Sequence, residues 1–91
     1  MLSIVKSNRF IKDLKLAIKR GLDISLLDDV VTKLANGEIL PKQYNDHQLM
    51  GEFADFRECH IKPNWLLVYS IDDVELELFL FRTGTHSDLF R

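Results

Sequence analysis

The chain has 91 residues, enough for one domain with one modest hydrophobic core. With 46% hydrophobic and 29% charged residues and few glycines and prolines, the composition excludes a disordered chain, and no apolar run is long enough to span a membrane. The net charge of −2 argues against binding nucleic acid through overall charge alone. We therefore expect a single domain over residues 1–91 that makes no use of a membrane.

The charges are unevenly distributed along the chain. Residues 1–20 carry six basic side chains and one acidic one, whereas residues 70–81 carry four acidic side chains and no basic one. The basic end is therefore suited to an acidic partner or a phosphate backbone. The single cysteine, Cys59, excludes an intramolecular disulfide and fits a reducing compartment. Since residues 1–15 also lack the apolar segment of a signal peptide, we expect a cytoplasmic protein.

The first half of the chain predicts a short strand followed by two helices. The strand is the apolar run "LSIV". Ser7 suits the N-cap of the first helix, because its hydroxyl can accept a hydrogen bond from a free N–H of the first turn. Gly21 ends that helix, Asp23 can cap the second, and Asn36–Gly37 ends it. The expected buried positions, at helical spacing, are Phe10, Leu14, Ala17 and Ile18, then Leu27, Val30, Val31 and Leu34.

From Pro41 onwards the pattern changes to that of an antiparallel sheet. After an aperiodic stretch, residues 55–63 alternate in the manner of a strand. Residues 64–71 and 74–82 are rich in β-forming residues, with Asp72–Asp73 at the position of a hairpin turn. One face of the alternating strand should hold Phe56, Glu58, His60 and Lys62, and the other Arg57, Cys59 and Ile61. We expect an α+β fold in which the helical hairpin packs on one face of a mainly antiparallel sheet of three or four strands.

Three histidines lie in this second half, in the polar contexts "NDHQLMG", "RECHIKPNW" and "GTHSD". Any one alone is best explained as a surface or hydrogen-bonded structural residue. In a meander, however, His47 entering one strand, His60 within a strand and His86 just after the last strand can converge. Histidines supply a general base and a general acid near neutral pH, and Arg57 and Arg82 can hold a phosphate.

Base, acid and guanidinium groups suit the attack of a ribose 2′-hydroxyl on the neighbouring phosphate. Such an enzyme needs no cofactor and cuts RNA but not DNA. A metal site is the competing interpretation, but no pair of histidines has a close ligand spacing such as HxxxH.

The remaining candidates are one cysteine and several aromatic residues. Cys59 adjoins His60, but neighbouring strand residues point to opposite faces, so we expect Cys59 in the core. Trp65, Phe79 and Phe81 are also expected in the core. Phe90 lies beyond the periodic region, where it can stack on a base or simply anchor the end of the chain.

At these residues the chain resembles the YafQ branch of the RelE-like bacterial toxins. The stretches "DHQLMG", "FRECHIKPNWLLVY" and "RTGTHSDLF" match its three signature segments, and the resemblance covers nearly the whole chain. It implies a RelE-like fold with a short C-terminal tail or turn carrying His86. It also implies a type II toxin, a ribosome-dependent endoribonuclease that cuts mRNA. The implied partners are the ribosome and an antitoxin, often of ribbon-helix-helix type, with an acidic toxin-binding segment.

The resemblance also implies roles for individual residues. His47 and His60 match two family histidines that are candidate bases, and His86 matches the proton donor to the leaving group. Arg82 matches the arginine at the scissile phosphate, and Phe90 the aromatic residue near the substrate base.

Two positions depart from the usual family pattern. Glu58 replaces an aspartate by a carboxylate on a longer side chain. Asn64 stands where an aspartate usually takes part in acid–base chemistry or orients a histidine, and an asparagine cannot take up a proton. The base is therefore expected to be His47 or His60. The alternative is a RelE-like protein that binds antitoxin or ribosome without cutting RNA.

Overall fold

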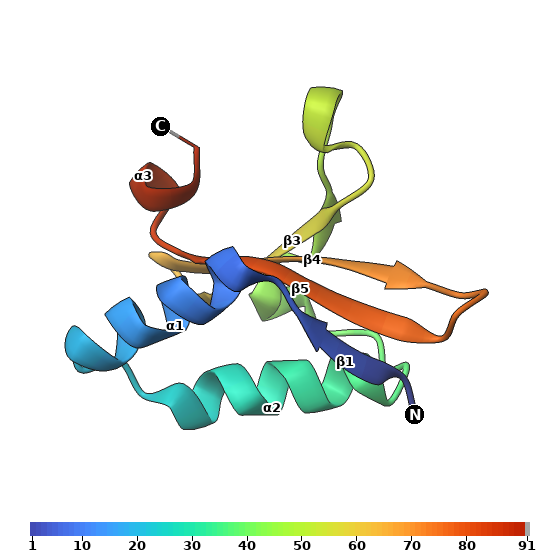
Figure 1. Ribbon diagram of the computed structural model, residues 1–91, viewed down its shortest axis with the longest axis horizontal. Coiled ribbons are helices and arrows are strands. Elements are labelled where there is room, and N and C mark those ends of the chain that lie inside the picture. The colour runs from blue at the N-terminus through green and yellow to red at the C-terminus, as the bar shows by residue number, and fades with distance from the viewer. Residues whose placement is uncertain (91) are drawn as a thin grey trace.

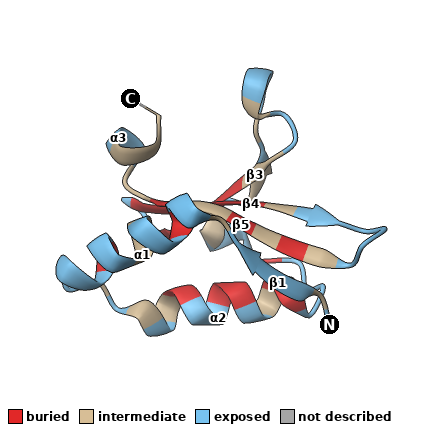
Figure 2. Ribbon diagram, in the orientation of Figure 1, coloured by how far each residue is buried: buried red, intermediate tan, exposed pale blue. Residues whose placement is uncertain are grey.

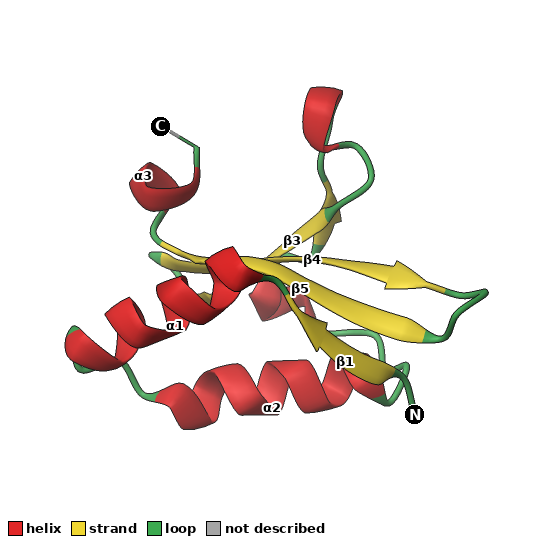
Figure 3. Ribbon diagram, in the orientation of Figure 1, coloured by secondary structure: helices red, strands yellow, loops and turns green. Residues whose placement is uncertain are grey.

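The computed structural model describes residues 1–90, in which two helices lie under one face of a five-stranded sheet (Figures 1 and 3). The elements are β1 (Ser3–Lys6), α1 (Asn8–Lys19), α2 (Ile24–Ala35), η1 (Lys42–Tyr44), β2 (His47–Gln48), η2 (Gly51–Phe53), β3 (Arg57–Lys62), β4 (Trp65–Asp72), β5 (Glu77–Gly84) and α3 (His86–Leu89). The expected α+β fold, with the helical hairpin on one face, is confirmed. The segment with His86 is a short helix, α3, rather than a tail or a simple turn.

The strand order across the sheet is β1-β5-β4-β3-β2. Strands β2 to β5 pair antiparallel with their neighbours, as predicted, whereas β1 pairs parallel with β5, with Ser3 opposite Glu77 and Lys6 opposite Leu80. Strand β5 therefore lies between the first strand and β4. α3 and η2 both lie on the side of the sheet opposite α1 and α2 (Figure 1).

The predicted ends of the helices are confirmed. The Ser7 hydroxyl accepts a hydrogen bond from the Phe10 N–H at 2.9 Å, and the Asp23 carboxylate caps α2 in the same way. Each helix is followed by a glycine with positive φ, Gly21 at 78° and Gly37 at 76°, a conformation that costs other residues steric strain. These local hydrogen bonds and turns fix where the helical hairpin starts and stops.

The main core lies between the helices and the sheet, where the buried parts of α2 and the central strands face one another (Figure 2). All four core positions predicted for α2 are buried, as are Phe10 and Ala17 in α1. The prediction that Ile18 is buried is wrong, because its side chain is 58% exposed. It lies about 100° around the helix from Ala17, outside the stripe that meets β5. Trp65 and Cys59 are in this core, as predicted.

The opposite face of the sheet carries a second, smaller group of aromatic side chains. Phe79 and Phe81 are only half-buried there, so the prediction of full core positions is wrong for both. They stack with Phe56, whose ring centroid lies 4.5 Å from that of Phe81. Within residues 1–90 no long helix covers this face, where the three aromatic rings pack against one another. We call this side of the sheet the open face.

Candidate active site

The register of the strands brings the predicted site residues into two neighbouring rows on the open face. His47 lies opposite Glu58, Glu58 opposite Val68, and Val68 opposite Arg82. One row further along the strands, His60 lies opposite Leu66, and Leu66 opposite Gly84, which leads into α3. Residues opposite one another in adjacent strands share a face and lie about 5 Å apart. The sheet thus holds histidine, carboxylate and arginine side chains at fixed spacing.

Glu58 lies between the two histidines. Its Oε1 atom is 3.6 Å from His47 Nε2 and 3.7 Å from His60 Nε2. The Glu58 side chain is buried, whereas both imidazoles are partly exposed. One carboxylate therefore lies within 4 Å of both rings. The longer side chain of glutamate reaches both rings from β3.

A hydrogen bond fixes which nitrogen of His47 is available for chemistry. Its Nδ1 lies 2.9 Å from the carbonyl oxygen of Asn45. A carbonyl oxygen only accepts, so Nδ1 carries the hydrogen and Nε2 is the atom that gains or loses a proton. That atom lies 3.6 Å from Glu58 Oε1.

The residue before His47 is anchored from the other side of the sheet. The buried phenol of Tyr69 donates a hydrogen bond of 2.6 Å to Asp46 Oδ1, and Arg57 Nε lies 3.4 Å from the same oxygen. Burial, followed by the hydrogen bond to Asp46, raises the pKa of Tyr69, so the phenol stays a donor. Asp46 and Tyr69 were not predicted as site residues, because they are 23 residues apart in sequence and only the folded sheet brings them into contact.

Arg57 is not brought together with the other candidates. It lies opposite Tyr69, on the helix-covered face, while Glu58 and His60 point to the open face, as the alternation predicted. Its ion pair with Asp46 explains this position. We therefore assign Arg57 to the support of Asp46, and not to the phosphate contact expected from the sequence.

Arg82 lies on the open face because the strand alternation breaks beside it. The register of β4 and β5 shifts between Val68 and Tyr69, so the successive residues Phe81 and Arg82 both line a cavity of about 100 Å³ on that face. Asp13 in α1 holds the guanidinium, accepting from Nε at 2.7 Å and from Nη2 at 3.1 Å. The Nη1 nitrogen makes no hydrogen bond within residues 1–90, and it is free to bind a phosphate oxygen.

His86 is the first residue of α3 and is exposed. Thr85 caps the helix by accepting from the Asp88 N–H, while the Asp88 side chain accepts from the Thr85 N–H, which is a capping box. Phe90 follows the helix, and its ring lies 5.2 Å from that of His86 and 5.6 Å, edge to face, from that of Phe53 in η2. Phe90 and Phe53 thus join α3 to the β2–β3 loop across the open face.

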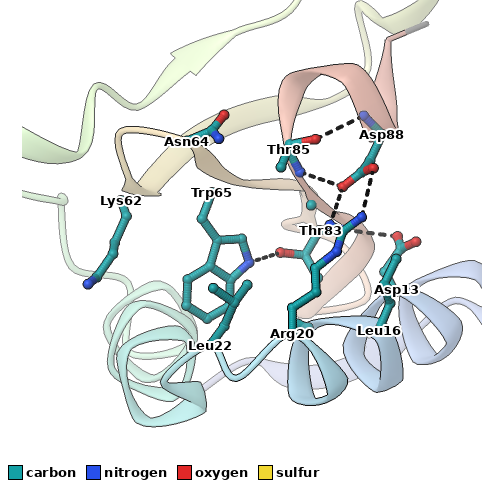
Figure 4. A pocket seen from close by; sticks show the side chains of 12 residues that line it. Asp13, Leu16, Arg20, Leu22, Lys62, Asn64, Trp65, Thr83, Thr85 and Asp88 are labelled. Carbon is teal, nitrogen blue, oxygen red and sulfur yellow. Dashed lines mark hydrogen bonds and ion pairs between the residues drawn. The ribbon is translucent and has the colours of Figure 1, made fainter.

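Asn64 lies in the exposed turn between β3 and β4, apart from Glu58 and the two strand histidines. It lines a cavity of about 200 Å³ together with Trp65, Thr85 and Asp88, at the base of α3 (Figure 4). No hydrogen bond joins Asn64 to His60 within the described chain. The position at which the resemblance leads us to expect an aspartate thus carries a neutral side chain beside α3.

Cys59 is excluded as a nucleophile. It is fully buried in the main core, and this burial raises the pKa of the thiol to about 12. A protonated thiol behind the sheet cannot attack a substrate on the open face.

Two further properties bear on the class of site. Within residues 1–90, no three histidine, cysteine, aspartate or glutamate side chains form a group able to hold a metal ion. No helix of this part of the chain is both long and apolar enough to cross a membrane.

The fold, a helical hairpin on one face of a small sheet, is shared with solved structures of small bacterial toxins. The family model described as "Bacterial toxin of type II toxin-antitoxin system, YafQ" matches residues 2–91. The chain belongs to this family, and the resemblance predicted from its three signature segments is confirmed.

Relatives of known structure and name support the assignment. The chain is 41% identical over 85 residues to the mRNA interferase toxin YafQ of Escherichia coli K12, covering 92% of this chain and 90% of the relative. A crystal structure of a metal-bound toxin from Helicobacter pylori is 52% identical, with a TM-score of 0.94, over 99% of this chain and 100% of that one. YafQ in the E. coli DinJ–YafQ complex is 39% identical, with a TM-score of 0.91, over 100% of both chains.

Proposed function

We propose that this chain is an mRNA interferase that acts in the cytoplasm on mRNA bound to the ribosome. Its E. coli relative carries the name mRNA interferase toxin. The single observation that best supports the proposal is the pair of cross-strand rows, which bring two histidines, a glutamate and an arginine to one open face. α3 adds His86 at the end of the same face.

In the proposed reaction, Nε2 of His47 or His60 takes the proton from the ribose 2′-hydroxyl, and Glu58 stabilises the imidazolium that forms. The 2′-oxygen attacks the phosphorus, and the bond from phosphorus to the 5′-oxygen breaks. His86 gives its proton to that 5′-oxygen. The products are a 2′,3′-cyclic phosphate and a 5′-hydroxyl. Arg82 balances the charge that develops on the phosphate, and Phe90 stacks on a neighbouring base.

The proposed chemistry uses no metal ion. The H. pylori relative was crystallised with a bound metal, so the role of metals needs a direct test. Cleavage should proceed unchanged when the toxin alone is treated with a chelator, the chelator is then removed, and the ribosomes keep their own magnesium. Loss of cleavage that returns on adding back a transition metal would overturn the metal-free reaction.

The proposed acid is tested by His86→Ala, with Ser87→Ala as the matched control on the same exposed helix. Loss of a general acid is expected to lower the single-turnover cleavage rate about 100-fold or more. Because neither side chain is buried, the melting temperature should hardly change. Primer extension on ribosome-bound mRNA measures the rate, and near-normal cutting by the folded His86→Ala protein would contradict the assignment.

The alternative is a protein of this fold that binds ribosome or antitoxin without cutting RNA. The neutral Asn64 in the place of the family aspartate favours it, because one potential proton acceptor is missing. Cosedimentation with ribosomes but no cleavage at any toxin concentration would support this alternative against the proposed reaction.

We also propose a partner antitoxin of ribbon-helix-helix type with an acidic segment. The E. coli relative was solved in complex with the antitoxin DinJ. Here the exposed basic side chains of α1, Lys12, Lys15 and Lys19, offer a surface for acidic residues.

A further inference from the structure

The position of α3 is only partly explained by apolar packing, in which Leu89 and Phe90 meet Phe53 on the open face. The helix has four residues and none of them is buried. An isolated helix shorter than about 12 residues is only marginally stable in water, so α3 would not stay folded without contacts to the rest of the domain. Between its base and the C-terminal end of α1 lies the cavity of about 200 Å³ shown in Figure 4, where a packed core would otherwise support the helix. The few contacts that α3 makes must therefore set its place.

Asp88 links α3 to α1 through Arg20. Its Oδ2 atom accepts from Arg20 Nη1 at 2.8 Å and from the Thr85 N–H at 2.9 Å, and its Oδ1 atom lies 3.4 Å from Arg20 Nη2 (Figure 4). The hydrogen bond from Arg20, followed by that from Thr85, lowers the pKa of Asp88 well below its usual range. The carboxylate is thus ionised near neutral pH, so it can accept both hydrogen bonds from Arg20.

Gly84 shows how closely Asp88 fits against the end of β5. A Cβ atom added at Gly84 would lie 2.9 Å from Asp88 Oδ2, too close for an ordinary contact, and φ of Gly84 is 156°. The carboxylate thus occupies the space that a side chain at position 84 would fill. Arg20 reaches this point from α1, 68 residues away in sequence.

Arg20 is the second of two residues through which α1 holds the C-terminal segment. Asp13, seven residues earlier and on the same side of the helix, accepts from Arg82 and from the Thr83 N–H at 3.1 Å. Residues seven apart lie one above the other, two turns along a helix. Through Asp13, α1 contacts the end of β5, and through Arg20 it contacts α3.

We propose that Arg20 is a positioning residue for cleavage: its two-point ion pair with Asp88 holds α3 against the sheet, so that His86 and Phe90 face the reacting phosphate. This inference rests on the proposed function, and it adds a residue outside the three signature segments. Arg20 itself touches neither His86 nor the open face. The competing explanation is that its partly exposed guanidinium binds RNA directly.

The kinetic test compares Arg20→Ala, Asp88→Asn and the double variant with wild type, in single-turnover cleavage over a range of toxin concentrations. We expect Arg20→Ala to lower the rate at saturation about two- to fivefold, because the rate follows the fraction of molecules with α3 in place and an exposed ion pair is worth about 1 kcal/mol or less. The concentration for half-maximal rate should not change. Arg20→Lys should recover part of the rate, and Lys33→Ala, which removes one charge from α2, should behave as wild type.

The double variant separates positioning from RNA binding. If Arg20 acts only through Asp88, then Arg20→Ala has no further effect in the Asp88→Asn background. A full additional loss in that background, or a raised half-saturating concentration with an unchanged maximal rate, means that Arg20 binds RNA and overturns the proposal. The melting temperature should stay close to that of wild type, since exposed ion pairs contribute little to stability.

A measurement without RNA keeps this inference separate from the proposed function. Nuclear Overhauser contacts between the rings of Phe53 and Phe90, and ¹⁵N relaxation of residues 86–89, report directly on the place of α3. Both should show a loosened helix in Arg20→Ala but not in Lys33→Ala. If wild type does not cut mRNA while the order of α3 still depends on Arg20, the proposed function fails, but the positioning of α3 by Arg20 is supported. If α3 stays ordered in Arg20→Ala, the proposal that Arg20 positions α3 is overturned, whatever the cleavage activity of the variant.

Discussion

The hydrogen bond from Tyr69 to Asp46 allows a quantitative prediction for Tyr69→Phe. The substitution removes one oxygen from a side chain that is 1% exposed, and leaves the volume of the core nearly unchanged. A hydrogen bond to a charged group contributes about 1.5–3 kcal/mol. Asp46 keeps its ion pair with Arg57 and is partly exposed to water, so the lower part of this range applies. We expect a loss of about 2 kcal/mol in the free energy of unfolding, with a melting temperature lower by about 10 °C for a domain of this size.

The same substitution should reach the active site. Asp46 precedes His47, so a loosened Asp46 lets the imidazole move away from Glu58. Cleavage by Tyr69→Phe at a temperature where it is fully folded should therefore fall several-fold. Tyr44→Phe is the matched control, because the Tyr44 hydroxyl makes no hydrogen bond within residues 1–90 and the ring packs against the same core.

The raised pKa of Tyr69 adds a dependence on alkaline pH. Folding favours the protonated phenol, so this contribution to stability is complete below the unfolded pKa of about 10 and is lost as the pH rises above it. Thermal unfolding followed by circular dichroism between pH 7 and pH 11 should show a steeper alkaline decline for wild type than for Tyr69→Phe. Equal melting temperatures and equal cleavage for the two proteins would refute the reasoning.

Four further outcomes are expected. Cys59 should react with a thiol reagent at pH 8 only as the domain unfolds, because it is fully buried with a pKa of about 12; labelling as fast as that of a free thiol would contradict this. Asn64→Asp should raise single-turnover cleavage or shift the acidic limb of its pH profile, whereas superimposable profiles from pH 5.5 to 8.5 would remove position 64 from the acid–base chemistry. Association with the antitoxin, measured by stopped flow, should slow between about 50 and 500 mM salt; a rate indifferent to salt would argue against an electrostatic surface on α1. The lowered pKa of Asp88 predicts that its ion pair holds α3 in place above about pH 4 and weakens as the pH falls below this value. The Overhauser contacts between Phe53 and Phe90 should therefore decrease at low pH in wild type, and Asp88→Asn should not show this transition.

Local features of the fold were predictable from the sequence because local interactions determine them. Ser7 and Asp23 cap helices through hydrogen bonds to N–H groups two or three residues away. The alternation in β3 correctly separated Glu58 and His60 from Cys59, since neighbouring strand residues always point to opposite faces. The resemblance of the three signature segments then supplied the family.

Long-range features of the site were not predictable in this way. The ion pair of Arg82 with Asp13 joins residues 69 apart, and the register shift that turns Arg82 to the open face leaves no clear mark in the sequence. Phe79 and Phe81 lie within apolar runs typical of core strands, but within residues 1–90 only the short helices α3 and η2 lie on their side of the sheet. The parallel pairing of β1 with β5 likewise depends on where the later strands place β5 relative to the first strand, which no local pattern in the sequence indicates.

That parallel pairing also orders the events of folding. Residues 3–6 leave the ribosome early, but their partners at 77–80 are made more than 70 residues later. Until then β1 has no neighbour, β4 lacks one side of its ladder, and α1 lacks the carbonyl and arginine groups of β5 that it binds. Contacts this distant in sequence close late and slow the folding of a small domain. A growing chain therefore cannot complete the open face until its last residues are made, and a truncation within β5 removes pairings with both β1 and β4.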